Sequence, residues 1–581
     1  MYLLERLKRR RVITTDDSKP KNYVRIHSLI IMGLGGSLGL GIYVLVGQVV
    51  LQMTGPAITV SVTIAVLASL FAVLCIAELS SRVPHSGSAY IYSYVIMGEF
   101  VAFTVGWSML LEYMTSTASA ARGLSSYLNV LLDDKLSNAF QSILTLNCSF
   151  TSTYLDFLSF ALILLGSCLL ACGAKQSMWL NLVLTIINLI TICIIIIAGT
   201  TFSDMKNWSR SSSEVPIGAG SGGYFPYTLE GLFRGAAICV FGIVGLNCIT
   251  PLNGDVINSN HYVPMAIFIS MLIVFCTYFV VTNILTAMIP YYLLNPFTPI
   301  VSAFKYYNLD SVCWCVIVGS VLALIMSLLN FMFSMPPIMH AMAEDALMFK
   351  CFAYTQSLTR ASMIVTVLTG IMAAFLALII SFDFLIELSI IGVMLAYTIV
   401  AIGVILMHYK VDDVDNAAGN NGKDINFKRA MSQIVKKPRE KRSNALSQYT
   451  ARMFLYIFLL LSASFCVVLK FRPVIHDLWL IMLAASIGIL NILCIIMINL
   501  QPKSTDFPPF KAPCVPVIPC VSIWLNLFLV SKMSGSACIA YLFWMIIGYI
   551  IYFGQVTADF LGKNLTRKVA KEMISNLKFV V

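Results

Sequence analysis

Residues 33–47 read Gly33-Leu34-Gly35-Gly36-Ser37-Leu38-Gly39-Leu40-Gly41-Ile42-Tyr43-Val44-Leu45-Val46-Gly47, an apolar run that contains six glycines. Each glycine inside a helix costs roughly 1 kcal/mol relative to alanine. Six glycines within fifteen residues therefore predict a helix that is broken in its middle. The alternative is tight packing of two helices through small residues, as in GxxxG motifs.

A broken helix in an apolar run has a specific meaning in a membrane. Unsatisfied backbone groups are costly in hydrocarbon, so irregular backbone occurs only where protein or an aqueous cavity surrounds it. Half-helix N-termini of this kind bind carboxylates, whereas unwound carbonyl groups bind cations. An amino acid carries both charges on one carbon. Residues 33–47 therefore predict a binding site for such a molecule.

The composition is that of a polytopic membrane protein. The 581 residues are 59% hydrophobic and 11% charged, and the mean hydropathy is +0.86. Runs long enough to cross about 30 Å of hydrocarbon predict fourteen crossings, centred near residues 40, 68, 115, 164, 189, 242, 276, 325, 371, 396, 461, 488, 523 and 547.

The charge distribution predicts the orientation. The basic N-terminus precedes any apolar segment, so we expect no cleavable signal peptide. With both termini in the cytosol, most of the 38 Lys and Arg residues fall on the cytosolic side, as the positive-inside rule requires. The net charge of +11 therefore indicates contact with anionic lipid and not with nucleic acid. The sequons at Asn147 and Asn207 fall outside the cell in this topology and are predicted glycosylation sites.

Five regions follow from these patterns. They are a cytosolic N-terminal tail (1–27), a ten-helix transport core (28–408), a disordered basic cytosolic linker (409–452), four additional transmembrane helices (453–558) and a cytosolic C-terminal tail (559–581).

The sequence gives no sign of an enzyme, a cofactor or a metal site. Its sixteen cysteines form no CxxC pair, and nearly all lie in apolar segments. The six histidines are scattered, and no HExxH motif occurs. We expect no obligate protein partner; the expected partners are the lipid bilayer and a small-molecule substrate.

Polar residues follow one face of the third crossing at helical spacing. They are Thr104, Ser108, Glu112, Thr115, Ser119 and Arg122. Because intramembrane ionisable groups normally face the interior of a bundle, Glu112, Thr115 and Ser119 are candidates for substrate binding. Hydrogen bonding between packed helices is the alternative. Neutral polar stripes on the fifth crossing (Asn181, Thr185, Asn188, Thr191) and the eighth (Ser320, Ser327, Asn330, Ser334) do not by themselves predict a sodium site.

The sixth crossing contains a second interruption, at Val240-Phe241-Gly242-Ile243-Val244-Gly245-Leu246-Asn247-Cys248. It lies five crossings after the first. This spacing is typical of a five-plus-five inverted repeat with discontinuous helices 1 and 6.

The chain resembles the eukaryotic cationic amino acid transporters of the amino acid, polyamine and organocation superfamily over nearly its whole length. The matching segments are Gly39-Leu40-Gly41-Ile42-Tyr43-Val44-Leu45, Gly55-Pro56-Ala57-Ile58, Ala77-Glu78-Leu79 with Arg82-Val83-Pro84, Gly87-Ser88-Ala89-Tyr90-Ile91-Tyr92-Ser93-Tyr94 with Gly98-Glu99, Met335-Pro336 with Ala341-Met342-Ala343-Glu344-Asp345, Leu395-Ala396-Tyr397, Phe510-Lys511-Ala512-Pro513 and Ile550-Ile551-Tyr552-Phe553-Gly554.

The resemblance implies an all-α integral membrane protein with a LeuT-like core and four further helices, carrying arginine, lysine and ornithine across the plasma membrane by alternating access. Backbone donors at Gly39, Leu40, Gly41 and Ile42 would bind the substrate carboxylate, and carbonyls around Ile243, Val244 and Gly245 would bind its ammonium group. Phe241, beside Gly242, would close over the substrate. Glu99 matches an acidic position needed for transport, where it would attract cations or simply be an exposed acid at a helix N-terminus.

Departures from the family pattern concern the substrate. Three positions that are carboxylates in the family are neutral here, at Asn247, Gly254 and Gln48. Selectivity for cations then rests on Glu112, on Glu99 or on carbonyl dipoles, while Asn247 stays a candidate for contact with the substrate. The alternatives are a carrier of neutral amino acids or polyamines, an amino-acid-sensing receptor with little transport, and a lysosomal or endosomal location.

Overall fold

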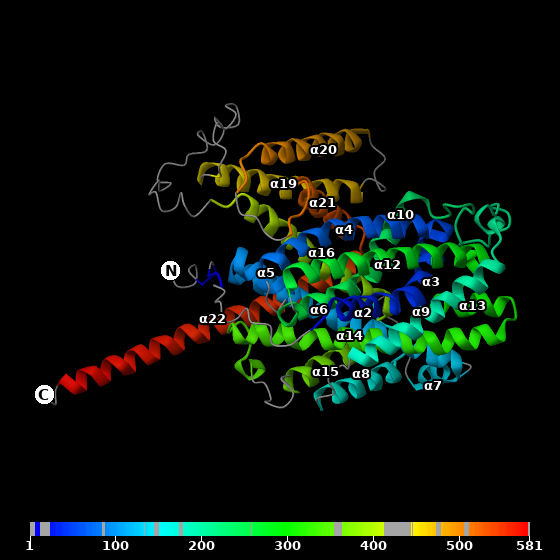
Figure 1. Ribbon diagram of the computed structural model, residues 1–581, viewed down its shortest axis with the longest axis horizontal. Helices are drawn as coiled ribbons and strands as arrows, with labels where there is room; N and C mark the ends of the chain where they lie inside the picture. Colours follow the sequence, from blue (N-terminus) through cyan, green and yellow to red (C-terminus); the bar gives the residue numbers. More distant parts are fainter. Residues whose placement is uncertain are drawn as a thin grey trace.

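The computed structural model describes residues 6–7, 9–11, 24–83, 88–132, 134–143, 150–172, 178–256, 258–353, 363–411, 443, 445–471, 478–504 and 510–578. These residues are helical with short connections, and their only strand-like pairings are the isolated bridges Val24–Val256 and Thr151–Ile380. Most helices run in roughly the same direction along the molecule, side by side (Figure 1).

In chain order the elements of the first half are α2 (Ile26–Ser37), η1 (Gly41–Leu45), α3 (Val46–Val49), η2 (Val50–Thr54), η3 (Gly55–Ala57), α4 (Ile58–Arg82), α5 (Ser88–Ile96), α6 (Glu99–Leu131), α7 (Lys135–Ile143), α8 (Phe157–Ala171), α9 (Met178–Thr201), η4 (Met205–Trp208), α10 (Thr228–Cys239), α11 (Phe241–Val244), η5 (Gly245–Asp255) and α12 (Ser259–Met288). Those of the second half are η6 (Tyr291–Leu293), α13 (Pro299–Tyr306), α14 (Asp310–Glu344), η7 (Lys350–Ala353), α15 (Met363–Ile379), α16 (Phe382–His408), α19 (Ala445–Phe471), α20 (Leu478–Asn499), α21 (Val517–Ser531) and α22 (Gly535–Lys578).

The first crossing is interrupted where the glycines predict it. Helix α2 ends at Ser37, the chain bends at Leu38 and Gly39, and it continues after Leu40 as the π-helix η1. A π-helix closes wider turns than an α-helix and is frequent at functional sites. The prediction of a broken first helix is therefore confirmed.

The second interruption lies in the sixth crossing, as predicted. After α10 the chain turns at Val240, forms the single α-helical turn α11 and then continues as the 3-10 helix η5 from Gly245. Pro251 lies inside η5. Proline lacks the N–H group that a continuing α-helix needs.

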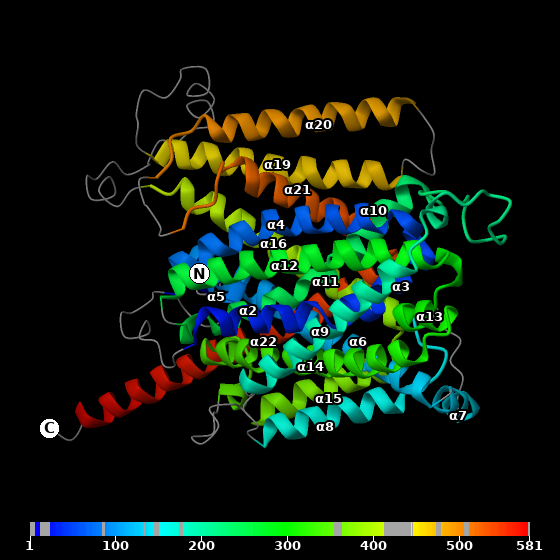
Figure 2. The ribbon, with the colours of Figure 1, turned by 45° about the vertical axis from the view of Figure 1, so that its right-hand side comes forward.

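The two interruptions lie against each other in the centre of the molecule. A Cβ atom built on Gly245 would lie 2.2 Å from the carbonyl carbon of Gly36 and 2.4 Å from the amide nitrogen of Ser37. The backbones thus touch where both helices are broken. Helices α4, α6, α12, α14 and α16 surround this centre, whereas α19 and α20 form an outer layer (Figure 2).

The final helix, α22, belongs to the core and not only to the periphery. The ring centroids of Trp107 on α6 and Trp544 on α22 are 4.5 Å apart, and the rings are stacked. Each indole nitrogen donates a hydrogen bond to the backbone carbonyl of the other tryptophan, at 2.8 Å and 3.1 Å. Beyond this contact α22 continues past the body of the molecule toward the C-terminus (Figure 1).

Each predicted crossing centre falls inside a described helix, except residue 40, which lies at the first break between α2 and η1. Among the described residues, nine helical segments are long and apolar enough to cross a membrane. One of these is the continuous segment Ile26–Arg82, which contains two of the predicted crossings. Helices α8, α15 and α21 are apolar but shorter. These segments make the chain a multi-pass membrane protein. The count of fourteen crossings and the five-plus-five repeat stay predictions.

Some predicted region boundaries differ from the helix ends. Helix α16 ends at His408, where the predicted core ends. Helix α19 begins at Ala445, seven residues before the predicted end of the linker at residue 452, and α22 continues to Lys578 through the predicted tail. Most of the linker lies outside the described residues.

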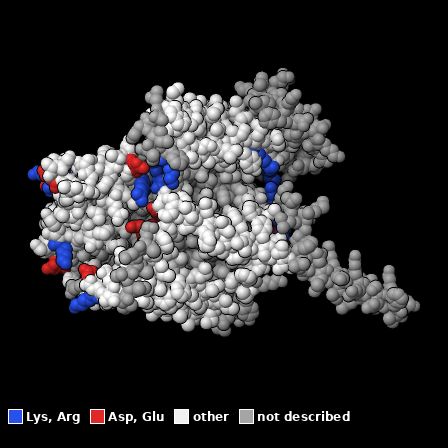
Figure 3. Space-filling model, turned by 180° about the vertical axis from the view of Figure 1, so that it is seen from behind, with Lys and Arg blue, Asp and Glu red and all other residues white. Residues whose placement is uncertain are grey.

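The surface is largely uncharged along the length of the helices. Figure 3 shows a face on which Lys, Arg, Asp and Glu gather in a few small groups, and other side chains cover most of the described surface between them. Large apolar side chains point outward from several helices, among them Leu165 on α8, Ile197 on α9 and Met482 on α20, which are 62%, 69% and 65% exposed. Such a surface is suited to hydrocarbon and not to water.

The contact between the two breaks gives a first prediction. Gly245→Ala should lower the free energy of unfolding by about 1–3 kcal/mol because the added methyl group overlaps the backbone of Gly36 and Ser37. The midpoint of thermal unfolding in detergent measures this change. The control is Gly488→Ala in α20, where the nearest atom lies 3.8 Å from the added Cβ. Equal midpoints for the two variants would contradict the contact.

Candidate functional site

The carbonyl groups released at the first break are bonded by side chains of three other helices. The last carbonyls of a helix have no partner within it. Tyr278 on α12 donates to the Ser37 carbonyl at 3.0 Å, and Ser327 on α14 donates to that of Gly35 at 3.0 Å. Asn188 on α9 donates to the Leu38 carbonyl at 3.4 Å. The break is therefore held open by polar groups of the protein.

The glycines of the first break face protein atoms and not open space. A Cβ atom on Gly39 would lie 2.1 Å from the Ser327 hydroxyl oxygen, and one on Gly41 would lie 1.6 Å from the Tyr278 hydroxyl oxygen. Leu40 and Ile42 are buried. The alternative explanation, close packing through small residues, therefore holds at these glycines. The helix is also broken there, so both explanations apply. A ligand reaches Gly39 or Gly41 only after Ser327 or Tyr278 moves.

The two predicted backbone segments nevertheless lie side by side. A Cβ atom on Gly41 would be 3.0 Å from the Cα atom of Gly242. Ile243, Val244 and Gly245 follow directly in α11 and η5 and are buried. Phe241, which is 2% exposed, has its ring centroid 6.4 Å from that of Phe331 on α14.

Asn247, two residues into η5, is the centre of a buried polar cluster. Its amide nitrogen donates to Oε1 of Glu112 at 2.8 Å, and its amide oxygen accepts a hydrogen bond from the Tyr397 hydroxyl at 2.8 Å. Its backbone carbonyl accepts from Tyr113 at 3.3 Å and from Thr250 at 2.9 Å. The cluster joins the second break to α6 and α16.

Glu112 is the least satisfied member of this cluster. The residue is 1% exposed, and its second carboxylate oxygen, Oε2, has no hydrogen-bond partner. Within the described residues it forms no ion pair either. A buried carboxylate without a cation is costly, and a buried polar atom without a partner is rare in native proteins. Oε2 is therefore an open position for a donor that the described part of the chain does not supply.

The other members of the predicted polar stripe on α6 do different work. Thr115 and Ser119 donate to backbone carbonyls of their own helix. Ser108 contacts the Tyr541 hydroxyl at 2.6 Å and Thr104 that of Tyr549 at 3.4 Å, both on α22. Arg122 binds the carbonyls of Ala377 and Leu378 and the Ser152 hydroxyl, and so ties α6 to the end of α15.

Comparisons with known proteins identify the family to which this arrangement belongs. Residues 26–428 match the amino acid permease family, and residues 510–557 match the C-terminus of that permease group. The chain belongs to the amino acid permease family. The predicted resemblance is thereby confirmed, and so is the expectation that this permease is not an enzyme.

Several curated relatives cover most of the permease. Mouse (Mus musculus) cationic amino acid transporter 4 is 33% identical over 554 residues, which are 90% of this chain and 86% of the relative. The human (Homo sapiens) protein of the same name is 32% identical over 555 residues, with the same coverage. An Arabidopsis thaliana relative, cationic amino acid transporter 2, vacuolar, is 27% identical over 567 residues, which are 90% of this chain and 87% of the relative.

Glu99 lies far from the two breaks, at the first residue of α6. Thirteen residues of helix separate it from Glu112, or about 20 Å. The side chain of Glu99 is fully buried and accepts hydrogen bonds from Arg6 at 3.0 Å and from Tyr552 on α22 at 3.2 Å. Arg9 lies 3.3 Å from its other oxygen. The interpretation of Glu99 as an exposed acid is therefore wrong, and in this conformation its charge is already neutralised.

The residues that neutralise Glu99 belong to an N-terminal arm, Arg6 to Arg11, that the sequence analysis assigned to a cytosolic tail. Next to Arg6 and Arg9, Arg11 binds Asp345 with both carboxylate oxygens, at 3.2 Å and 3.0 Å. Tyr90 on α5 donates to the same carboxylate at 2.7 Å. The arm thus joins α5, α6, α22 and the residues after α14.

One of the two predicted glycosylation sites lies among the described residues. Asn147 lies outside the described residues. Asn207 in η4 is 4% exposed, and its amide nitrogen donates to the Ala287 carbonyl at 2.7 Å. Glycosylation of Asn207 stays a prediction.

Sequence reasoning missed the side chains that hold the breaks. Tyr397 occurs in a family segment, and Asn188 and Ser327 occur in the neutral stripes, but none was assigned a role. Tyr278 carries no local signal in the sequence. The importance of these residues comes from partners that lie far away in the chain.

The arm gives a second prediction. Arg6→Ala leaves the buried Glu99 carboxylate with Arg9, whose side chain is 51% exposed, and should cost about 3–5 kcal/mol of unfolding free energy. The double variant Arg6→Ala/Glu99→Gln should cost less than Arg6→Ala, because no buried charge is left behind. Thermal unfolding of the variants in detergent measures both effects.

The exposed pair Arg210–Glu214 provides the control for the arm. Its side chains are 34% and 54% exposed, so that Arg210→Ala should change stability by no more than about 1 kcal/mol. A double variant less stable than Arg6→Ala would contradict the ion pair as the source of the effect.

Proposed function

We propose that the permease transports cationic L-amino acids such as arginine, lysine and ornithine. The observation that carries this proposal is the buried Glu112 carboxylate, whose Oε2 atom has no partner beside the second break. A guanidinium or ammonium group supplies both the missing charge and the missing hydrogen bond. The mouse, human and Arabidopsis relatives are all named cationic amino acid transporters, which supports the same substrate class.

Recognition of the amino acid head group would use the broken backbone. The N–H groups of residues 39–42 would bind the carboxylate, and the carbonyls of residues 243–245 would bind the α-ammonium group. The contact of Gly41 with Gly242 supports a shared site for the two charges. Phe241 would cover the substrate, while Asn247 would orient Glu112 toward its side chain.

Transport would proceed by alternating access around these breaks. Tyr278 and Ser327 now occupy the space beside Gly41 and Gly39, so that binding requires both side chains to withdraw. The arm that binds Glu99 would close the cytosolic end and release it during the cycle. This mechanism assigns the core to a five-plus-five repeat with four additional helices and both termini to the cytosol.

Membrane potential would drive accumulation of a cationic substrate. Moving one charge across 100 mV is worth about 2.3 kcal/mol, and about 1.4 kcal/mol corresponds to a factor of ten. A monovalent cation is therefore concentrated roughly fiftyfold per 100 mV. The proposed location is the plasma membrane; the relative named vacuolar makes the lysosomal or endosomal membrane the alternative.

The corresponding prediction concerns flux and potential. Uptake of labelled arginine into proteoliposomes should rise when a potassium gradient with valinomycin makes the interior negative. Uptake of a neutral amino acid in the same vesicles should not change. Arginine uptake that is independent of the imposed potential would rule out electrogenic transport.

The role of Glu112 gives a further prediction. Glu112→Gln keeps the size of the side chain but removes its charge, so arginine uptake should fall about tenfold or more, because a hydrogen bond to a charged group is worth about 1.5–3 kcal/mol. Uptake of a neutral amino acid should fall less. The control is Glu214→Gln at an exposed position. An equal loss for both substrates would show that Glu112 does not contact the substrate side chain.

A carrier of neutral amino acids or of polyamines is the second candidate. It is favoured by Asn247, which places an amide instead of a second acid beside Glu112. Competition of arginine uptake by leucine, glutamine and putrescine distinguishes the substrates.

A further inference from the structure

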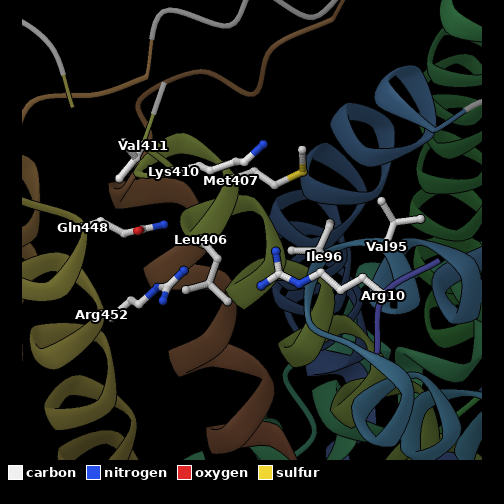
Figure 4. A pocket seen from close by; sticks show the side chains of 9 residues that line it. All are labelled: Arg10, Val95, Ile96, Leu406, Met407, Lys410, Val411, Gln448 and Arg452. Atoms are coloured by element: carbon white, nitrogen blue, oxygen red, sulfur yellow. The ribbon is translucent and has the colours of Figure 1, made fainter. Parts of the chain in front are cut away.

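A second site lies apart from the two breaks, between the core and the outer helix layer. It is a cavity of about 340 Å³ at the ends of α5 and α16 and the beginning of α19. Its volume falls within the range of small-ligand sites, about 300–1,000 Å³. Figure 4 shows Arg10 and Arg452 reaching toward it from opposite sides of Leu406, with Lys410 and Gln448 nearby.

The polar side chains of this cavity are positively charged or neutral. Arg10, Lys410 and Arg452 line it together with Gln448, and no described lining residue is acidic. Arg10 and Arg452 are close enough to repel each other. Neither arginine forms an ion pair within the described part of the chain. The cavity therefore concentrates positive charge that an anion would neutralise.

Arg10 differs from the neighbouring arginines of the N-terminal arm in the groups that its side chain faces. Its neighbours Arg9 and Arg11 turn to Glu99 and Asp345. Arg10 instead lines the cavity opposite helix α19. The arm thus divides its charges between the acids of the core and this cavity.

The surroundings of the cavity favour a lipid over a soluble anion. Ile96 and Leu406 form part of an apolar wall. On α19, Arg452, Tyr456 and Leu460 follow one another at intervals of four residues and so lie on one face of the helix. Tyr456 and Leu460 are 60% and 72% exposed. The charge thus continues into an apolar track along which acyl chains can lie.

We propose that this cavity binds the phosphate head group of an anionic phospholipid from the cytosolic leaflet. Basic pockets between transmembrane helices on the cytosolic side are suited to such head groups, and arginine binds phosphate through two parallel hydrogen bonds. The bound lipid would join α19 to α16 and to the N-terminal arm. The inference depends on the cytosolic orientation given under the proposed function but not on the substrate.

Binding is tested on the purified full-length chain in detergent, without any amino acid substrate. The probe is dioctanoyl phosphatidylinositol 4,5-bisphosphate, compared with dioctanoyl phosphatidylcholine and with soluble inositol trisphosphate, which has no acyl chains. Thermal unfolding is followed as each compound is added. We expect the anionic lipid alone to raise the unfolding midpoint in a saturable manner.

Variants connect the effect to the cavity. Arg10→Ala and Arg452→Ala should each weaken binding of the anionic lipid about tenfold or more, because each removes charged hydrogen bonds to phosphate. Arg452→Lys should weaken binding of the anionic lipid less than Arg452→Ala does. The matched control, Lys305→Ala, removes an exposed positive charge on α13 and should bind like the unaltered chain. Without lipid, all four should unfold at similar temperatures, which excludes misfolding as the cause.

Three results would overturn the proposal. Unchanged binding in Arg10→Ala and Arg452→Ala would place the lipid elsewhere. Equal stabilisation by soluble inositol trisphosphate would make the ligand a free anion, and equal stabilisation by phosphatidylcholine would show that charge is not recognised. Because no substrate is present, each result is separate from failure of the transport assay.

Discussion

Backbone groups that lose their helical partners at the two breaks need other hydrogen bonds within the membrane. The rest of the structure depends on these hydrogen bonds. Hydrocarbon offers no hydrogen bonds, so each carbonyl released at Ser37, Leu38 or Gly35 needs a partner from the protein. Tyr278, Asn188 and Ser327 supply them from three different helices. The hydrogen bonds from their side chains fix these three helices around the break. Glycines are required at the break because these side chains approach the backbone too closely to leave room for a Cβ atom.

Two glutamates of α6 show how differently a buried charge can be treated. Glu99 is surrounded by Arg6, Arg9 and Tyr552, and its charge is neutralised within the protein. Glu112 has one oxygen bonded to Asn247 and one that is free. A completed ion pair contributes to structure, whereas an incomplete one is suited to a ligand. Helix α6 therefore has a structural role at Glu99, its first residue, and the proposed substrate-binding role at Glu112, near its middle.

Local features were predictable from the sequence, whereas their partners were not. Helix positions follow from the lengths of the apolar runs, and both interruptions follow from glycine density. The meeting of Glu112 with Asn247, 135 residues later, was not visible, nor was that of Arg6 with Glu99, 93 residues later, since both depend on tertiary packing. The burial of Asn207 was not visible for the same reason, because a three-residue pattern carries no information on burial.

Tyr552 on the last helix and Arg6 near the first residue bind the same oxygen of Glu99. An N-terminal segment and the last helix are therefore joined at one atom, although 546 residues separate Arg6 from Tyr552 in the sequence. A displacement of the N-terminal segment is therefore expected to move the last helix directly, through Glu99 and not through the glycine-rich centre.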